Sequence, residues 1–365
     1  MSNSTENRLS RPEEDRPARP DVVSHLLGQL RRHPKRVVFT EGEDARVIAA
    51  ADRLVKEQVV APILLGQKER IEEIAKESNI SLELIHIINP SKASDYDLFC
   101  KRIENMDRYR SRHFSDPAEI VARPHYFGSL MVQYGQADAI VGGNQSIPAA
   151  YFRALIQTVK PMPDAPKIFG VTILIGEHLH HVGSQGLLFL ADTAMVPHPT
   201  AEELCSFAIE TGKLASHALG RPPLIAMLSH STKGSSRTQD ALRVIAATSL
   251  AQNQIQEQHL GFQIEGEVQA DVAVDPTASE IKYADGSQGS ADVLIFPNLD
   301  AAHISMKLLQ HVAGAQNYGQ IIVGLSRPAA QVPRTASVQT IFGTAAAVAV
   351  EAIKGHQLYP DGDVN

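Results

Sequence analysis

The chain has 365 residues, a hydrophobic fraction of 43% and a formal net charge of −7. This length predicts two domains, and an acidic chain lacks the basic excess that a nucleic-acid or membrane surface requires. No run of about 18 apolar residues is present, so we expect no membrane-spanning helix. The charged, proline-rich opening segment predicts no secretory signal and a cytoplasmic protein. Cys100 and Cys205 alone cannot build a disulfide framework or a cysteine metal site, and we expect no bound metal.

The first part of the chain alternates predicted strands and helices. Residues 1–20 place prolines among alternating charges, which is typical of a disordered tail, and a short amphipathic helix is predicted at residues 22–30. The apolar runs that predict buried strands are residues 36–40, 61–65, 84–88 and 137–141. Helical patterns between these runs predict parallel strands with helices on both faces of the sheet.

The second part of the chain continues the same alternation. The apolar runs that predict strands are residues 168–175, 187–191, 224–228, 293–296 and 321–323, and the main predicted helices are residues 201–219, 302–313 and 338–353. This pattern predicts an α/β fold with a domain boundary near residue 150.

A hydroxyl-rich loop follows the predicted strand 224–228, at the carboxyl end where open parallel sheets bind ligands. The loop covers residues 229–236, and its candidate ligand-binding residues are Ser229, Ser231, Thr232, Gly234 and Ser235. Hydroxyl and backbone N–H groups in this arrangement favour an anion. An equally good interpretation is a serine-rich turn that caps the next helix. The loop is not a P-loop, because the spaced glycines of that motif are absent.

A histidine and a lysine follow the predicted strand 293–296. His303 and Lys307 are four residues apart, so they share one face of the predicted helix and can bind a phosphate group together. The alternative is an exposed helix face with the lysine in solvent, and the spacing alone favours this alternative.

Several long stretches occur in a fixed order along the chain. They are RVVFTEGEDARVIAAA, YFGSLMVQYGQADAIVGG, LADTAMVPHPTAEEL, AMLSHSTKGSS, EGEVQADVAVDP, GSADVLIFPNLDAAHISMKLLQHVAG and GLSRPAAQVPR. In this order they resemble the phosphate acetyl/butyryltransferase family, over roughly residues 35–355. The resemblance is specific because many consecutive stretches match in sequence order.

This resemblance implies two parallel-sheet α/β domains with an interdomain cleft, and a homodimer. The implied division is a tail and short helix in residues 1–30, a first domain in residues 31–150 plus 322–360, and a second domain in residues 151–321. The implied reaction transfers a short acyl group, acetyl foremost, between CoA and inorganic phosphate without an acyl-enzyme. Acyl-CoA and phosphate are then the ligands, and no tightly bound cofactor is expected.

The family's carboxyl-terminal signature is only partly kept. Its catalytic serine falls on Pro333, its arginine on Arg334 and its general-base aspartate on Thr340. Proline has no hydroxyl to donate, and threonine is not a base at neutral pH. The resemblance therefore assigns catalysis to Arg334. His303 or His230 is a candidate substitute base, because histidine titrates near neutrality.

The family's phosphate-binding residues are better preserved. The resemblance places a phosphate-binding arginine at Arg153, and Lys307 retains a cation on the helix after residue 296. The basic run Arg108, Arg110 and Arg112 lies near the family's other phosphate arginine. The predicted substrate ligands are thus Arg153, Lys307 and the hydroxyl-rich loop 229–236.

Two further functions compete with the acyltransferase. The chain is also similar to the acetyl-CoA-sensing C-terminal domain of large bacterial malic enzymes, which predicts a non-catalytic acyl-CoA-binding regulator with a protein partner. Pro333 and Thr340 motivate this alternative. The other alternative, a nicotinamide-dependent dehydrogenase, is suggested only by the two-lobed architecture. No G-x-G-x-x-G motif for binding the dinucleotide follows a predicted strand. The transferase is ranked first.

Overall fold

The computed structural model describes residues 22–106, 116–162, 167–283 and 290–358. The predicted disordered tail and the basic run Arg108, Arg110 and Arg112 lie outside the described residues. The predicted short helix is α1, Val22–Arg32, and it ends with two arginines that suit the negative end of the helix dipole.

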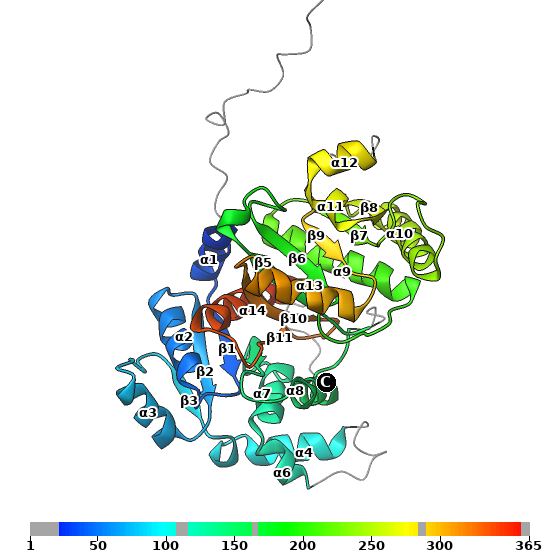
Figure 1. Ribbon diagram of the computed structural model, residues 1–365. Coiled ribbons are helices and arrows are strands. Elements are labelled where there is room, and N and C mark those ends of the chain that lie inside the picture. The colour runs from blue at the N-terminus through cyan, green and yellow to red at the C-terminus, as the bar shows by residue number, and fades with distance from the viewer. Residues whose placement is uncertain (1–21, 107–115, 163–166, 284–289, 359–365) are drawn as a thin grey trace, which may run out of the picture.

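The described strands form one 11-stranded sheet, in the order β3-β2-β1-β4-β11-β10-β5-β6-β9-β7-β8 (Figure 1). The strands are β1 Lys35–Phe39, β2 Val60–Leu65, β3 His86–Ile88, β4 Ala139–Gly142, β5 Phe169–Ile175, β6 Leu187–Ala191, β7 Leu224–Leu228, β8 Gln263–Val268, β9 Val293–Ile295, β10 Gln316–Val323 and β11 Ala329–Gln331. The α/β class predicted from the alternation of strands and helices is confirmed.

Two sets of parallel strands make up the ends of this sheet. The first set is β3, β2, β1, β4 and β11, and the second is β6, β9, β7 and β8. Strands β10 and β5 join them through antiparallel pairs, so the two sets run in opposite directions within one continuous sheet. Strand β5 is almost wholly buried and, apart from Thr172, apolar on both faces, which suits a central strand. The division into residues 31–150 plus 322–360 and 151–321 stays a prediction.

Helices cover both faces of the sheet. They are α2 Ala45–Lys56, α3 Lys68–Glu77, α4 Tyr96–Asn105, α6 Pro117–Val121, α7 Pro124–Gln133, α8 Pro148–Thr158, α9 Ala201–Leu219, α10 Gln239–Glu257, α11 Ala270–Val274, α12 Pro276–Lys282, α13 Leu299–His311 and α14 Val338–Leu358. Their ends follow ordinary capping chemistry: Thr200 and Glu203 form a capping box on α9, and Gly220 ends that helix with φ of 66°.

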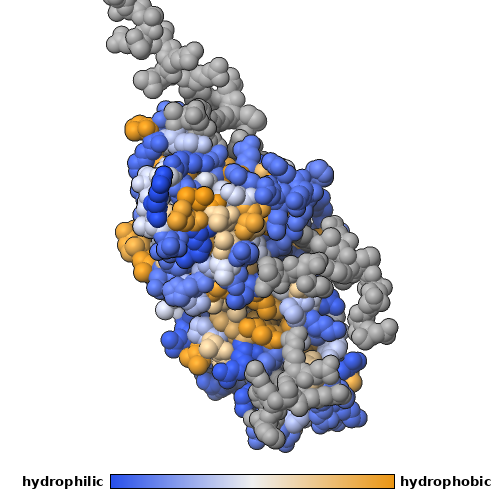
Figure 2. Space-filling model, turned by 90° about the vertical axis from the view of Figure 1, so that its right-hand side faces the viewer, coloured by the Kyte–Doolittle hydropathy of each residue, from blue (hydrophilic) through white to orange (hydrophobic). Residues whose placement is uncertain are grey.

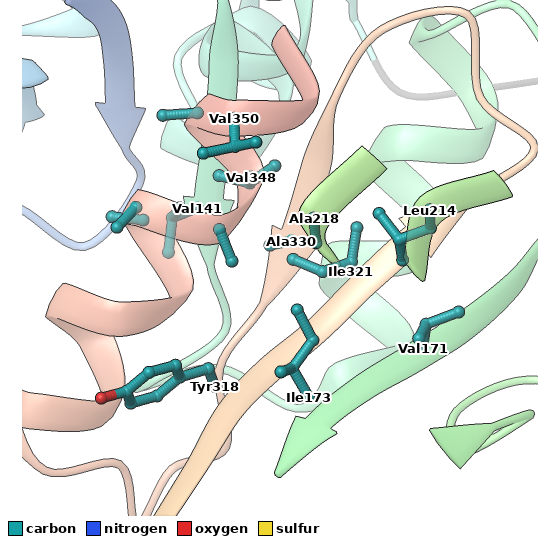
Figure 3. Close-up of a cluster of buried hydrophobic side chains, with 14 of the residues drawn as sticks. Val141, Val171, Ile173, Leu214, Ala218, Tyr318, Ile321, Ala330, Val348 and Val350 are labelled. Atoms are coloured by element: carbon teal, nitrogen blue, oxygen red, sulfur yellow. The ribbon is translucent and has the colours of Figure 1, made fainter. Parts of the chain in front are cut away.

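The hydrophobic core is continuous on one face of the sheet and divided on the other. Val37 and Phe39 of β1 belong to a cluster that extends through Ile321 to helices α9 and α14 (Figure 3). Val38, which points to the opposite face, belongs to a separate cluster under α7 and α8. A third cluster, containing Leu190 and Met306, lies under α13. The divided face thus leaves room between α8 and α13.

A bulge in β10 turns polar side chains toward this divided face. The register of β10 with β5 shifts between Tyr318 and Gln320, at Gly319, whose φ is 53°. A Cβ atom on Gly319 would approach the Thr344 side chain to 2.4 Å, so glycine is required there. Tyr318 packs in the continuous core, while Asn317 and Gln320 on either side of the bulge line the space between α8 and α13.

The surface is mainly hydrophilic, with several apolar patches on the face shown in Figure 2. Within the described residues, none of the helices has the length and apolar character that crossing a membrane requires. The same part of the chain holds no group of three or more His, Cys, Asp or Glu side chains arranged to bind a metal ion.

Candidate functional site

A cavity of about 530 Å³ lies between α8 and α13, above the bulged strand β10. Segments that follow β4, β6, β9 and β11 reach it, which is where open α/β sheets bind ligands. Its lining residues are Pro148, Phe152, Thr193, Ala194, Leu299, Asp300, His303, Ile304, Met306, Lys307, Asn317, Gln320, Gln331, Pro333, Arg334 and Thr335. Three of the predicted site residues, His303, Lys307 and Arg334, are therefore brought together.

Helix α13 supplies one wall of the cavity and two of its basic side chains. Asn298 caps the helix by accepting a hydrogen bond from the Ala301 N–H at 2.8 Å. His303 and Lys307 then lie one turn apart, as predicted. Burial lowers the pKa of Lys307, and no described side chain opposes this shift with a negative charge. A half-buried ammonium that faces a cavity without a counterion favours an anionic ligand.

The pKa of the His303 imidazole is shifted downward. Partial burial lowers its pKa below 6.5, the Lys307 charge lowers it further, and Asp300 opposes the shift. A neutral imidazole at the wall of the cavity can accept a proton from a bound group. The role of His303 as a base stays a prediction.

The loop between β11 and α14 supplies the opposite wall. Pro333, Arg334 and Thr335 line the cavity, and the Arg334 side chain is exposed. Thr340 lies beyond this loop, in the first turn of α14, and only 7% of its surface is exposed. Its hydroxyl lies 3.1 Å from the Ser337 Oγ atom, and it is not among the residues that line the cavity.

The floor of the cavity is polar and firmly held. Gln320 donates from Nε2 to the Thr193 carbonyl at 2.7 Å, and the Thr172 and Thr193 hydroxyls lie 2.9 Å apart. Asp192 accepts hydrogen bonds from the backbone N–H groups of residues 170 and 194–196, which fixes the turn after β6. Burial raises the pKa of Asp192, and these N–H groups oppose the rise. Asp192 therefore shapes the floor.

Met306 fills the floor from the side of α13. It is buried to 2% exposure and lines the cavity. The Thr172 hydroxyl approaches its sulfur to 3.3 Å, and the Asn317 amide nitrogen to 3.6 Å. A flexible thioether between two polar side chains sets the depth of the cavity at this point.

The hydroxyl-rich loop 229–236 does not line this cavity. It wraps around the carboxylate of Glu267, which is 2% exposed. Glu267 Oε1 accepts hydrogen bonds from the Ser231 hydroxyl and the Gly234 N–H, both at 2.8 Å. The side chain of Lys233 pairs with Glu265 at 3.0 Å. The groups that favour an anion are thus occupied by a carboxylate of the protein itself.

The remaining loop residues are also used locally. Thr232 Oγ1 accepts from the Gln269 N–H at 3.0 Å, and Ser235 Oγ accepts from the Thr232 N–H at 3.0 Å. His230 Nε2 lies 3.2 Å from the Ser236 hydroxyl. The predicted roles of Ser229, Ser231, Thr232, Gly234 and Ser235 in substrate binding stay predictions, and the contacts match the alternative of a serine-rich turn.

Arg153 lies on α8 beside the cavity without lining it. Its neighbour Phe152 lines the cavity, whereas Arg153 itself is exposed. The Arg153 charge acts on Tyr126, where it opposes the burial that raises the pKa of that phenol. Arg153 as a phosphate ligand therefore stays a prediction.

A polar network at the carboxyl ends of β1 and β4 was not predicted from the sequence. The Asp44 carboxylate receives hydrogen bonds from Arg46 Nη2 at 2.6 Å and from Asn144 Nδ2 at 2.8 Å. Glu41 accepts from the Gly143 N–H at 2.9 Å and from the Ser146 hydroxyl at 2.9 Å. The sequence signal was the dense polar run TEGEDAR directly after a buried strand.

Known proteins that are similar to this chain include phosphate acetyltransferases and phosphotransacetylases. The sequence profile of the phosphate acetyl/butaryl transferase family matches residues 21–349. A phosphate acetyltransferase from Thermoanaerobacterium thermosaccharolyticum is 33% identical over 333 residues, which are 91% of this chain and 99% of that protein. The structure of a phosphotransacetylase from Streptococcus pyogenes is 31% identical with a TM-score of 0.79, covering 91% of this chain and 99% of that one. The structure of a phosphotransacetylase from Staphylococcus aureus is 29% identical with a TM-score of 0.79, covering 91% of this chain and 98% of that one.

Proposed function

This chain belongs to the phosphate acetyl/butaryl transferase family, and we propose that it transfers an acetyl group between CoA and inorganic phosphate. The observation that carries this proposal is the cavity between α8 and α13, where Lys307 has no described counterion and Arg334 lies in the opposite wall. Two cations in one cavity suit a phosphate dianion and the negative charge that develops during acyl transfer.

The proposed reaction joins phosphate to the acyl carbon in a single transfer. A phosphate oxygen attacks the thioester carbonyl, a carbon–oxygen bond forms, and the carbon–sulfur bond then breaks to release CoA as a thiolate. Lys307 holds the phosphate, and the Arg334 guanidinium stabilises the oxyanion of the tetrahedral intermediate. His303, whose pKa is lowered by partial burial and by the Lys307 charge, accepts the proton of hydrogenphosphate and passes it to the thiolate.

A thiol-release assay tests this function directly. Acetyl-, propionyl- and butyryl-CoA are each mixed with the protein and phosphate, and free CoA is followed with a thiol reagent. We expect phosphate-dependent release that is fastest with acetyl-CoA. If none of the three gives release above background, while calorimetry detects acyl-CoA binding, the protein is the acyl-CoA-binding regulator instead.

The proposal extends to the working form of the protein. We infer a homodimer that uses acyl-CoA and phosphate as substrates, needs no tightly bound cofactor and acts in the cytoplasm. Family resemblance supports the dimer, and analytical ultracentrifugation checks it. Activity that persists after exhaustive dialysis against a chelator would support the absence of a cofactor or metal.

A further inference from the structure

Arg46 joins three loops that follow neighbouring parallel strands. Its Nη1 atom donates to the carbonyls of Arg334 and Ala336, both at 2.9 Å. Its Nη2 atom donates to Asp44 Oδ2 at 2.6 Å and to the Asn144 carbonyl at 3.3 Å. One guanidinium therefore connects the loops after β1, β4 and β11, of which the last carries Arg334 into the cavity.

The guanidinium is itself held in one orientation. Arg46 Nε donates to Asp44 Oδ1 at 3.0 Å, which completes a bidentate pair with the Asp44 carboxylate. Asp44 is 6% exposed and also accepts from Asn144 Nδ2 and Gln145 Nε2. Because Asp44 fixes one side of the planar Arg46 guanidinium, its remaining N–H bonds point in a fixed direction, toward the β11–α14 loop that carries Arg334 (the Arg334 loop).

We propose that Arg46 is a positioning residue for Arg334. Arg46 acts on Arg334 through the backbone of the β11–α14 loop. Arg46 does not line the cavity, so its effect on a ligand passes through this loop. The inference rests on the proposed function, because it assumes that Arg334 serves the reaction. A displacement of about 1 Å in a catalytic group can cost about 100-fold in rate, which sets the expected size of the effect.

A second arginine provides a matched control at the other end of the same strands. Arg36 makes a bidentate pair with Asp138, with Nη2–Oδ1 at 2.8 Å and Nε–Oδ2 at 3.2 Å. Its Nη2 atom also donates to the Gly135 carbonyl at 3.0 Å. Arg36→Ala thus removes the same kind of arginine–aspartate pair near the amino ends of β1 and β4. The contacts of Arg36 do not include the Arg334 loop.

The first experiment compares the kinetics of Arg46→Ala, Arg46→Lys and Arg36→Ala in the thiol-release assay. We expect Arg46→Ala to lower kcat/KM for phosphate about 100-fold, with kcat falling and KM for acyl-CoA unchanged. Arg46→Lys keeps the charge beside Asp44 but cannot span both carbonyls, so its activity should lie in between. Arg36→Ala should stay within about twofold of the unaltered protein. If Arg46→Ala does not fold, the test uses the kcat/KM of Arg46→Lys relative to Arg36→Ala instead.

The second experiment needs no turnover. Amide hydrogen exchange should be faster in residues 334–340 of both Arg46 variants than in Arg36→Ala. Folded Arg46 variants that match Arg36→Ala in both kinetics and exchange would overturn the inference. If the unaltered protein shows no thiol release, the proposed function fails, and exchange of the Arg334 loop alone then decides whether Arg46 holds it.

Discussion

Replacing Lys307 by methionine separates binding from folding at the cavity. The ammonium is half buried and has no described counterion, so in the unliganded protein its burial is uncompensated. Methionine keeps the length and apolar character of the stem while it removes the charge. We expect the variant to lose phosphate binding and to gain stability, a combination that general disruption of α13 would not produce.

The size of the loss in kcat/KM and the direction of the change in stability both follow from the charge of Lys307. A hydrogen bond to a charged group contributes about 1.5–3 kcal/mol, so kcat/KM for phosphate should fall about 10- to 150-fold. The lowered pKa of Lys307 means that the unfolded chain binds this proton more tightly than the folded one. Stability therefore rises with pH between the folded pKa and the usual value near 10.5, and at pH 7 the charged lysine is a cost that methionine removes.

The assay pairs phosphate kinetics with thermal unfolding. Lys282→Met serves as the control, because Lys282 of α12 is paired with Asp271 of α11 at 2.5 Å and does not line the cavity. The control should leave kcat/KM unchanged and should not raise the melting temperature. The reasoning is refuted if Lys307→Met keeps its kcat/KM for phosphate within twofold, or if its melting temperature falls.

Three further changes test other parts of the cavity. The lowered pKa of His303 predicts that kcat/KM for acetyl-CoA, measured at saturating phosphate, falls only on the acidic side of an ordinary histidine, and His303→Asn should abolish that fall; an unchanged profile would assign the proton transfer elsewhere. Met306→Ala removes the buried thioether from the floor, so the rate with butyryl-CoA should rise relative to acetyl-CoA, and an unaltered ratio would contradict this. Pro333→Ser combined with Thr340→Asp restores the hydroxyl and carboxylate of the family signature. Thr340 is buried and does not line the cavity, but the first turn of α14 favours an acid, so we expect kcat to rise; a lower kcat would show that this protein uses other groups.

The strands and part of the site could be predicted because their signals are local. Apolar runs such as Val37–Phe39 must be buried, and the residues that follow a parallel strand must lie at its carboxyl end. This reasoning placed Lys307 and His303 together, one helical turn apart. Strand β11 was not predicted, since Ala329–Gln331 is short and directly follows a proline.

Long-range partners were beyond the reach of the sequence. The loop 229–236 has the composition of an anion site, yet its donors are taken by Glu267, which lies 33 residues from Gly234 and on the next strand. Likewise, the Arg46 guanidinium meets the Arg334 carbonyl across 288 residues. Such pairings depend on which strands become neighbours in the sheet. No local sequence pattern specifies this order, so the pairings could not be predicted.

The antiparallel centre of the sheet explains how the two cations come to share one cavity. Lys307 belongs to α13, which follows β9 in one parallel set, and Arg334 belongs to the loop after β11 in the other. Strands β10 and β5 lie between these sets, and β10 pairs with β11 while β5 pairs with β6. The separation of the backbone positions that carry these two charges is therefore set by hydrogen-bonded strands rather than by a flexible linker. Backbone positions fixed in this way reduce the reorganisation that is needed when phosphate binds, which favours electrostatic stabilisation of acyl transfer.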